Sequence, residues 1–182
     1  ANAELRQLST LDPLTNVYNR RYLDEMLAVE CKRANRSGQN LALVLLDIDH
    51  FKPINDRYGH AVGDKCLRAV AEALAGVAKR PGDLLARYGG EEFVLVLPNT
   101  DEAQAARVAE EGRAAVAALA LDHEGTPLPL TISAGIAARV PAGNDMANRL
   151  LRDADRALYK AKDEGRNRVV KASQLQPEDL SV

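Results

Sequence analysis

The feature that most constrains the fold is an unbroken apolar run, Leu41 to Leu46, which stops at Asp47. A run of this length suits a buried β-strand, because no polar residue alternates with the apolar ones. It is far shorter than the roughly 20 residues that a membrane-spanning helix needs. The run therefore predicts a central strand of a folded domain, and we expect no direct insertion of this chain into a membrane.

Apolar residues at helical or strand spacing surround this strand. Amphipathic helices are expected at about 22–37, 67–77, 101–119 and 147–164. Further strands are expected at about 84–88, 93–97, 130–137 and 168–171. Gly89 and Gly90 indicate a hairpin, because paired glycines supply the positive φ angles of tight turns. The resulting β-α-β-β-α-β order predicts an α+β fold, with helices on one side of a mostly antiparallel sheet.

The 182 residues divide into three parts around a single domain. Residues 1–11 are interpreted as the end of a helical linker from an upstream regulatory region, since Leu5 and Leu8 have helical spacing and Pro13 disfavours helix just before it. Residues 12–172 are expected to form the domain. Residues 173–182 are interpreted as a polar C-terminal tail, expected to be frayed.

Composition argues against several classes of function. The chain has 24 Lys and Arg against 26 Asp and Glu, and this net charge of −2 argues against nucleic acid as a partner, because such binding needs a basic surface. Cys31 and Cys66 lie far apart and lack metal-ligand spacing, so neither a disulfide scaffold nor a zinc ribbon is expected. We expect a reducing, cytoplasmic setting.

Two pairs of acidic residues follow separate strand-like segments. Asp47 and Asp49 come at the carboxyl end of the central strand, and Glu91 and Glu92 lie in the hairpin turn. A helix start with Pro53 in its first turn would attract a phosphate through its free N–H groups, but the two aspartates would repel it. A hard cation such as Mg²⁺ resolves this conflict, because it binds carboxylates and phosphate oxygens together.

Each acidic pair alone also has a plainer explanation. Acidic residues after a strand commonly cap the next helix, and glutamates at a hairpin tip favour solubility. If the hairpin lies beside the central strand, however, Asp47 and Glu91 can share a pair of metal ions of the kind that assists phosphoryl transfer. Gly89 and Gly90 would then let a nucleotide approach the backbone closely.

Basic residues near the end of the last helix could bind the phosphates of such a nucleotide. Lys162 and Arg166 are four apart, on one helix face or just past the helix end beyond Gly165. The alternative is that these cations only complement the dipole of a helix C-terminus, and that Lys52 is a solvated surface charge.

Together these motifs resemble the GGDEF diguanylate cyclase family, with a GGEEF form of the signature. The resemblance covers residues 12–167 and rests on four stretches in the family's order: DPLT at 12–15 with Asn19-Arg20, DIDHFK at 47–52 with Asn55-Asp56 and Gly59-His60, RYGGEEF at 87–93, and DRALYKAKDEGRN at 155–167. It implies a palm-like fold, as in nucleotidyl cyclases and polymerases. It also implies an enzyme that condenses two GTP into cyclic di-GMP and releases two pyrophosphates.

The resemblance also implies the catalytic and metal-binding residues. Asp47, the carbonyl of Ile48 and Glu91 correspond to the ligands of two Mg²⁺ or Mn²⁺ ions in each active site. Glu92 corresponds to a partner carboxylate that assists the metals or the attacking hydroxyl. Because each site holds one GTP, two copies would have to face each other, so a homodimer is the implied active form.

The substrate-binding residues implied by the resemblance fall into two groups. Asn55 and Asp64 correspond to the residues that recognise guanine, with Asp64 accepting from its N–H groups. The triphosphate contacts correspond to Lys52, Lys162, Arg166 and the backbone near Phe51.

Arg80 and Asp83 match the family's RxxD inhibitory site, which binds the cyclic di-GMP product. An arginine can donate two parallel hydrogen bonds to guanine, and the aspartate can accept from its other edge. The alternative is an ordinary turn that ends a helix. The next helix offers Arg107 and Arg113 for a secondary contact, but Glu111 stands where a basic residue is expected.

Two other functions remain open beside the cyclase. One is a non-catalytic receptor that binds GTP or cyclic di-GMP, although degenerate receptors usually have a damaged signature. The other is a nucleotidyl cyclase with a mononucleotide product, against which the inhibitory motif argues.

Overall fold

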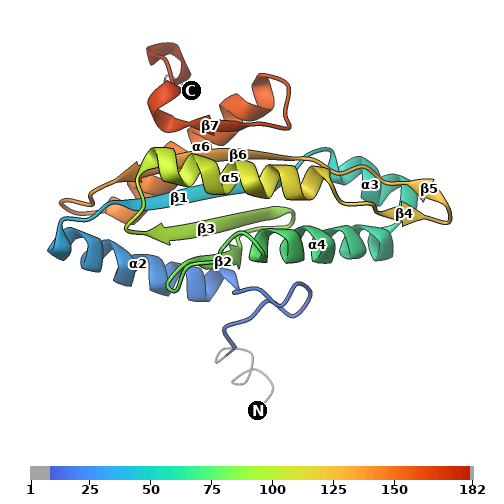
Figure 1. The fold of residues 1–182 in the computed structure, drawn as a ribbon, viewed down its shortest axis with the longest axis horizontal. Helices are drawn as coiled ribbons and strands as arrows, with labels where there is room; N and C mark the ends of the chain where they lie inside the picture. The colour runs from blue at the N-terminus through green and yellow to red at the C-terminus, as the bar shows by residue number, and fades with distance from the viewer. Residues whose placement is uncertain (1–8, 181–182) are drawn as a thin grey trace.

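A five-stranded sheet organises the computed structural model, which describes residues 9–180 (Figure 1). The strands lie in the order β2 (Leu84–Arg87), β3 (Glu92–Pro98), β1 (Leu41–Ile48), β6 (Ile132–Arg139) and β7 (Val169–Lys171). Neighbouring strands are antiparallel except β6 and β7, which are parallel. The α+β class, the central strand and the mostly antiparallel sheet are thus confirmed.

Helices cover both faces of this sheet. One face packs against α3 (Phe51–Tyr58), α4 (His60–Ala75) and α5 (Glu102–Ala117), and the other packs against α2 (Arg20–Ser37) and α6 (Met146–Asp163). Val44 points into the first layer and Leu43 into the second, because successive strand residues face opposite sides. The expectation of helices on one side only was therefore wrong.

The segment after β1 forms a short helix, α3, with Pro53 in its first turn as expected. What was not predicted is the break after it, where Gly59 with φ of 89° separates this helix from α4. The expected helix begins earlier than predicted, at His60, so Gly63 and Asp64 lie inside α4.

The hairpin between β2 and β3 forms as predicted, with register Arg87 opposite Phe93. The reason given for it was wrong, since neither Gly89 nor Gly90 is among the glycines with positive φ.

Close packing of α6 on β6 depends on Gly135. A Cβ atom at this position would lie 2.2 Å from both the Ala154 carbonyl oxygen and the Leu158 nitrogen. Any side chain there would force the helix away from the sheet. The helix backbone thus lies directly on the strand, and this packing fixes where its last turn, with Lys162, meets the end of β1.

Residues 9–19 form a strap along the β2 edge of the sheet. Tyr18 lies beside Ala86 in a parallel bridge, and its backbone exchanges hydrogen bonds with Leu85 and Arg87 at 3.2 and 2.9 Å. Asn19 then caps α2, its side chain accepting from the Tyr22 N–H at 2.9 Å. The helical linker predicted for residues 1–11 falls mainly on residues 1–8, outside the described residues. Residues 9–11 are not helical, and Leu11 forms an antiparallel bridge with Tyr18.

Two peripheral features were not predicted: a small hairpin, and helical turns within the C-terminal tail. A small hairpin, β4 (Asp122–His123) and β5 (Thr126–Pro127), precedes β6. The tail forms two 3₁₀ helices, η1 (Ala172–Gln174) and η2 (Pro177–Leu180), and Asp179 pairs with Lys160 at 3.1 Å. The expectation of a frayed tail was therefore wrong for residues 173–180. Within residues 9–180, no helix combines the length and apolar character needed to cross a membrane.

Candidate nucleotide and metal site

The carboxyl end of β1 and the β2–β3 turn meet at one place. Asp47 is the cross-strand partner of Glu92, and the Ile48 N–H donates to the Glu91 carbonyl oxygen at 3.2 Å. The two acidic pairs, separate in sequence, therefore converge as expected when the hairpin lies beside the central strand.

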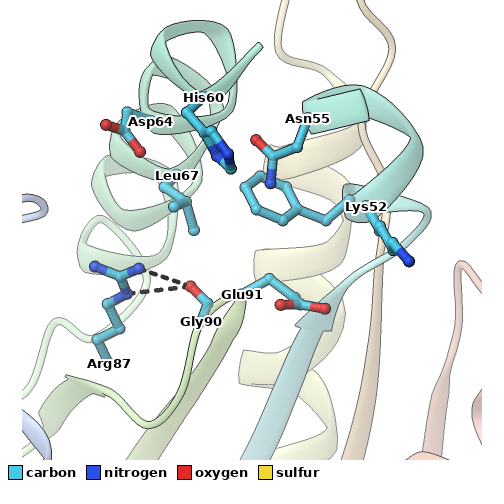
Figure 2. A pocket seen from close by; sticks show the side chains of 9 residues that line it. Lys52, Asn55, His60, Asp64, Leu67, Arg87, Gly90 and Glu91 are labelled. Atoms are coloured by element: carbon cyan, nitrogen blue, oxygen red, sulfur yellow. Dashed lines mark hydrogen bonds between the residues drawn. The ribbon is translucent and has the colours of Figure 1, made fainter. Parts of the chain in front are cut away.

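Two adjacent pockets open around this point. The first, here the α3–α4 pocket, has a volume of about 400 Å³ and includes Asn55, Asp64 and Gly90 (Figure 2). The second, here the strand-end pocket, has a volume of about 250 Å³; it is lined by Asp47, Ile48, Asp49, His50, Phe51, Lys52, Pro53, Glu91, Lys162 and Arg166. Phe51, Lys52 and Glu91 line both pockets, so the two form one continuous candidate site.

The α3–α4 pocket presents polar groups from two helices. Figure 2 shows Asn55 on α3 and Asp64 on α4 at its upper part, with Gly90 and Glu91 of the hairpin below. Asn55 lies so close to α4 that a Cβ on Gly63 would fall 1.8 Å from its Oδ1 atom. Glycine at position 63 is thus what lets Asn55 take this place next to Asp64.

The strand-end pocket holds a compact charged cluster. Asp47 is 6% exposed, and its Oδ2 accepts a hydrogen bond from Lys162 Nζ at 2.7 Å. Burial raises the pKa of Asp47, the charges of Glu91 and Asp49 add to this, and Lys162 opposes them without cancelling the shift. Burial likewise raises the pKa of Glu92, and the charge of Asp47 adds to it.

Asp49 has a different role from the one expected. Both of its carboxylate oxygens accept hydrogen bonds from the protein: from Thr131 Oγ1 at 2.8 Å, Ser133 Oγ at 2.6 Å and the Asn167 N–H at 3.0 Å. The expectation of a cation between Asp47 and Asp49 is therefore not supported, because this carboxylate is already used to join three segments.

Lys162 and Arg166 line the strand-end pocket together. Lys162 belongs to the last turn of α6, whereas Arg166 lies past the helix end with φ of 65°. Of the two arrangements considered for this pair, the structure therefore has the one in which Arg166 lies past the helix end, beyond Gly165.

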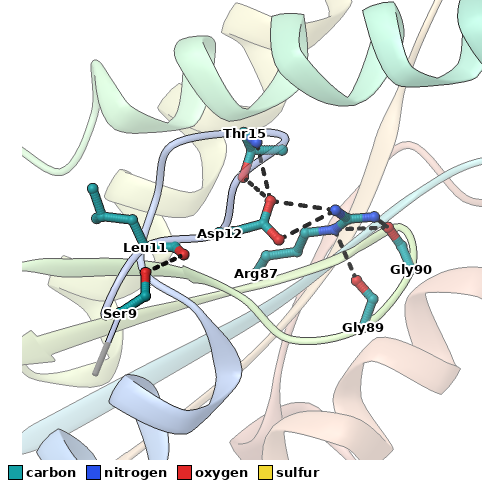
Figure 3. A network of polar contacts seen from close by, with 7 residues as sticks. All are labelled: Ser9, Leu11, Asp12, Thr15, Arg87, Gly89 and Gly90. Carbon is teal, nitrogen blue, oxygen red and sulfur yellow. Dashed lines mark hydrogen bonds and ion pairs between the residues drawn. The ribbon is translucent and has the colours of Figure 1, made fainter. Parts of the chain in front are cut away.

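The turn that carries Gly89, Gly90 and Glu91 is held by Arg87 (Figure 3). Arg87 Nε donates to the carbonyl oxygens of Gly89 and Gly90 at 3.3 and 3.2 Å, and Nη1 donates to Asp12 Oδ2 of the strap at 3.3 Å. Burial alone would raise the pKa of Asp12, but hydrogen bonds from Thr15 and the charge of Arg87 lower it overall. A Cβ on Gly90 would meet nothing within 4 Å, so this residue faces open pocket.

The oxygen atoms at this site fit a hard divalent cation whose remaining coordination positions would be filled by a bound ligand and water. Carboxylates of Asp47 and Glu91 and the backbone carbonyl of Ile48 are oxygen donors of the kind that Mg²⁺ prefers. Across residues 9–180, no three His, Cys, Asp or Glu side chains form a ready-made metal site. Mg²⁺ commonly takes one or two carboxylates together with phosphate oxygens and water, so an incomplete protein set is what a shared metal–nucleotide site requires.

Arg80 and Asp83 are adjacent, but both are engaged within the chain. The Asp83 carboxylate accepts from the Arg80 N–H at 3.1 Å, and Arg80 Nη2 donates to the Pro98 carbonyl at 3.1 Å and also to the Thr100 hydroxyl. Arg113 is paired with Glu110 at 2.6 Å. A ligand at Arg80 would have to replace these partners.

Three further residues line the α3–α4 pocket without having been assigned a role: His60, Leu67 and Arg87. Arg87 and His60 stand within motifs that the sequence made visible, but nothing in the motifs shows the hydrogen bonds that Arg87 forms. Leu67 was recognised only as part of an apolar helix face.

Comparison with known proteins identifies the class of protein to which this fold and site belong. Residues 9–168 match the family described as "Diguanylate cyclase, GGDEF domain". The crystal structure of the GGDEF domain of DgcB from Caulobacter crescentus in complex with c-di-GMP superimposes with a TM-score of 0.85 at 39% identity, covering 91% of this chain and 94% of that one. The fold is thus the palm-like α+β fold of GGDEF domains.

Two curated relatives lead to the family itself. Diguanylate cyclase DgcP of Pseudomonas aeruginosa is 46% identical over 164 residues, which cover 90% of this chain and 24% of the relative. Response regulator PleD of Caulobacter vibrioides is 43% identical over 166 residues, covering 90% of this chain and 36% of PleD. The chain belongs to the GGDEF diguanylate cyclase family, and it spans about a quarter to a third of these two relatives.

Proposed function

We propose that this domain condenses two GTP molecules into cyclic di-GMP and releases two pyrophosphates, in a metal-dependent reaction between two copies. One observation carries the proposal: Glu91 lines both pockets, and so joins a pocket with amide and carboxylate groups to one with Asp47 and Lys162. Family membership supports the same reaction.

In the proposed complex the guanine base occupies the α3–α4 pocket. Asp64 accepts from the N1–H and N2–H groups of guanine, and the Asn55 amide binds the remaining polar edge. Gly89 and Gly90 leave room for the nucleotide beside the turn, since a side chain on Gly90 would project into the pocket.

The triphosphate lies in the strand-end pocket, bound by Lys52, Lys162, Arg166 and backbone N–H groups at the start of α3. Phe51 begins this helix, and His50 provides no side-chain cap, so the first N–H groups are free for an anion. With a cation held at Asp47, Lys162 would be free to bind the phosphates, so that both the carboxylate and the phosphates would be neutralised.

Asp47, the Ile48 carbonyl and Glu91 would hold two Mg²⁺ or Mn²⁺ ions, with Glu92 assisting. Such ions lower the pKa of an attacking hydroxyl and neutralise charge on departing pyrophosphate. Glu91 and Asp47 orient the reacting groups so that the 3′-hydroxyl of one GTP can approach the α-phosphorus of the other in line.

The proposed reaction needs a homodimer, because each copy would hold one GTP, with its base in the α3–α4 pocket. We propose that residues 12–172 are the cyclase domain, that residues 1–11 link it to an upstream regulatory domain, and that the reaction takes place in the cytoplasm. The short linker would set how two copies meet.

Product inhibition at Arg80 and Asp83 is a further part of the proposal. Arg80→Ala should relieve inhibition by cyclic di-GMP while the initial rate stays similar, because Arg80 lies in neither pocket of the candidate site. Initial rates at increasing product concentration measure this. Inhibition that persists unaltered would remove the assignment.

Pyrophosphate release from GTP and Mg²⁺ tests the central claim. The unchanged chain should release pyrophosphate and form cyclic di-GMP, and Glu91→Gln should lower the rate about 10³-fold, since metal ions contribute several kcal/mol to such reactions. Glu72→Gln, which neutralises an exposed glutamate of α4, is the matched control. GTP binding without pyrophosphate release by the unchanged chain would instead indicate a receptor, and an unaffected Glu91→Gln would contradict the metal assignment.

A further inference from the structure

Asp49 is a buried carboxylate for which the proposed reaction has no use. It is 6% exposed and accepts hydrogen bonds from Thr131, Ser133 and the backbone N–H of Asn167. Two of these donors lie at the start of β6, and the third lies in the loop after α6. The carboxylate therefore ties the end of β1 to a loop 118 residues further along the chain.

That loop, residues 164–168, has an unfavourable backbone conformation. Arg166 and Asn167 have φ angles of 65° and 47°, which residues other than glycine rarely adopt. Surrounding contacts must hold such a conformation. Asn167 is held twice, by Asp49 through its N–H and by Arg113 Nη1 through its Oδ1 at 2.9 Å.

The loop matters because it places Arg166 in the strand-end pocket, where Asp47 and Lys162 also lie. We propose that Asp49 is a positioning residue that fixes the loop of residues 164–168 and so places Arg166 against the triphosphate. This inference rests on the proposed function, since it assumes that a nucleoside triphosphate occupies the site. Asp49 itself touches neither metal nor substrate in this assignment.

The competing explanations are that Asp49 is a metal ligand or that it only stabilises the fold. A metal ligand would affect turnover whether or not Arg166 is present. A purely structural group would affect every ligand and the melting temperature alike. A positioning residue acts through Arg166, so it should affect only ligands that carry the phosphates that Arg166 binds.

The test compares Asp49→Ala with the unchanged chain in binding two ligands in the presence of Mg²⁺. The first is 3′-deoxy-GTP, which lacks the attacking hydroxyl and cannot react, and the second is guanosine, which lacks phosphates. Asp49→Ala should weaken 3′-deoxy-GTP binding about tenfold, because the Asn167 N–H loses a charged acceptor, while guanosine binding stays within about twofold.

Two comparison variants sharpen the result. Asp49→Asn should retain most of the affinity, because its amide oxygen can still accept from Asn167 and its NH₂ group can donate to Ser133. Thr131→Val removes one hydrogen bond to Asp49 but leaves the Asn167 contact, so it should bind 3′-deoxy-GTP as the unchanged chain does.

A double-mutant cycle with Arg166→Ala gives the decisive outcome. Asp49→Ala should add little to the loss already caused by Arg166→Ala, since both act on the same contact. Additive losses, equal weakening of guanosine, or unchanged 3′-deoxy-GTP binding by Asp49→Ala would overturn the inference and leave the proposed function standing. Failure of the unchanged chain to bind 3′-deoxy-GTP at all would overturn the proposed function, and this inference with it.

Discussion

The α3–α4 pocket and the strand-end pocket are neighbours, yet they are prepared for a ligand in different ways. In the first, neither the Asn55 amide nor the Asp64 carboxylate has a hydrogen-bond or ion-pair partner within residues 9–180. In the second, Asp47 is paired with Lys162, and Asp49 is saturated by hydroxyl and N–H donors. The polar groups of the first pocket are open to a ligand as they stand, whereas Asp47 in the second must exchange Lys162 for a cation in order to bind one.

The difference follows from burial. Asn55 and Asp64 sit on helix surfaces where water can satisfy them, so they need no internal partner. Asp47 is almost fully buried, and an unpaired carboxylate there would be costly. Internal neutralisation by Lys162 therefore stabilises the protein before any ligand arrives, and it makes binding in this pocket an exchange of charges.

The largest effect should come from Asp47→Asn, which removes the charge around which the strand-end pocket is organised. We expect cyclic di-GMP formation to fall about 10³-fold or more, because a neutral amide binds hard cations poorly. GTP affinity in the absence of metal should change little, since the base pocket is intact. Product formation and nucleotide titration measure the two quantities, with Glu72→Gln as control; full turnover by Asp47→Asn would contradict the assignment.

Gly63→Ala should act mainly on the α3–α4 pocket. The new Cβ would collide with Asn55 Oδ1, the mobile end of a side chain, and lie 3.3 Å from Phe51 Cζ, so Asn55 should rotate away while Phe51 shifts by a few tenths of an ångström. GTP affinity should fall about tenfold, because one base-edge contact is worth about 1–3 kcal/mol. The ratio of GTP affinity to ATP affinity should therefore decrease.

The control for that change is Gly76→Ala at the end of α4. Its Cβ would come only 3.3 Å from the Ala73 carbonyl oxygen, far from either pocket. Competition between GTP and ATP for the two variants and the unchanged chain gives the comparison. Equal loss of selectivity in both variants would show that the effect does not arise from Asn55.

Lys162→Met should distinguish two effects of Lys162: its competition with a metal ion for Asp47, and its own binding to phosphate. Without Lys162 the Asp47 carboxylate loses its competitor, so Mn²⁺ should bind the ligand-free protein more tightly, while GTP affinity falls about tenfold. Lys52→Met is the matched control for Mn²⁺ binding. It removes another lysine that is proposed to bind the triphosphate, but Lys52 has no ion-pair partner in the described chain, so Mn²⁺ affinity should not change. Weaker Mn²⁺ binding by Lys162→Met would contradict the competition between lysine and metal.

The smallest effect concerns the turn between β2 and β3, which Arg87 holds together with Asp12 of the strap. Asp12→Asn should lower the free energy of unfolding by about 1 kcal/mol at neutral pH, the usual net worth of one hydrogen bond, because the Asn amide can still accept one of the hydrogen bonds that Asp12 accepts. The folded state holds the pKa of Asp12 below its unfolded value. Its contribution is therefore complete above the unfolded pKa and is lost as pH falls through the folded one.

Urea unfolding between pH 3 and pH 7 measures this. The free energies of unfolding of Asp12→Asn and of the unchanged chain should become more similar as the pH falls toward 3. Asp24→Asn is the control, because Asp24 forms only an exposed surface pair with Arg20, worth about 0–1 kcal/mol. A constant difference between Asp12→Asn and the unchanged chain across this pH range would contradict the role of the ionised carboxylate.

Sequence patterns predicted the elements better than their assembly. The apolar run ending at Asp47 located β1 and its acidic end, because burial on a strand leaves a direct trace in the sequence. The sequence carries no comparable trace of the position of α2 and α6 on the opposite face of the sheet from α4 and α5. An apolar helix face shows that the helix packs against another element, but it does not show which one. The break at Gly59 was not predicted either, because the short helix α3 and the longer helix α4 follow each other directly along the chain.

The candidate site shows the same limit at the level of single side chains. Asp47 and Glu91 could be predicted to meet, because strand ends and a hairpin turn restrict where they lie. The saturation of Asp49 could not, because its donors come from β6 and from a loop whose left-handed residues, Arg166 and Asn167, carry no glycine signal. Which carboxylate is free for a ligand is decided by contacts distant in sequence.

The strap of residues 9–19 has one more consequence, for how copies of this domain can associate. By bridging Tyr18 to Ala86 it occupies the backbone groups of the outermost strand, β2, and the opposite border, β7, is only three residues long. Exposed strand borders are where chains join into continuous sheets and aggregate. Because one edge is covered by the strap and the other offers only three residues, two copies have little backbone through which to pair. Contacts through side-chain surfaces can form and separate without unfolding either partner.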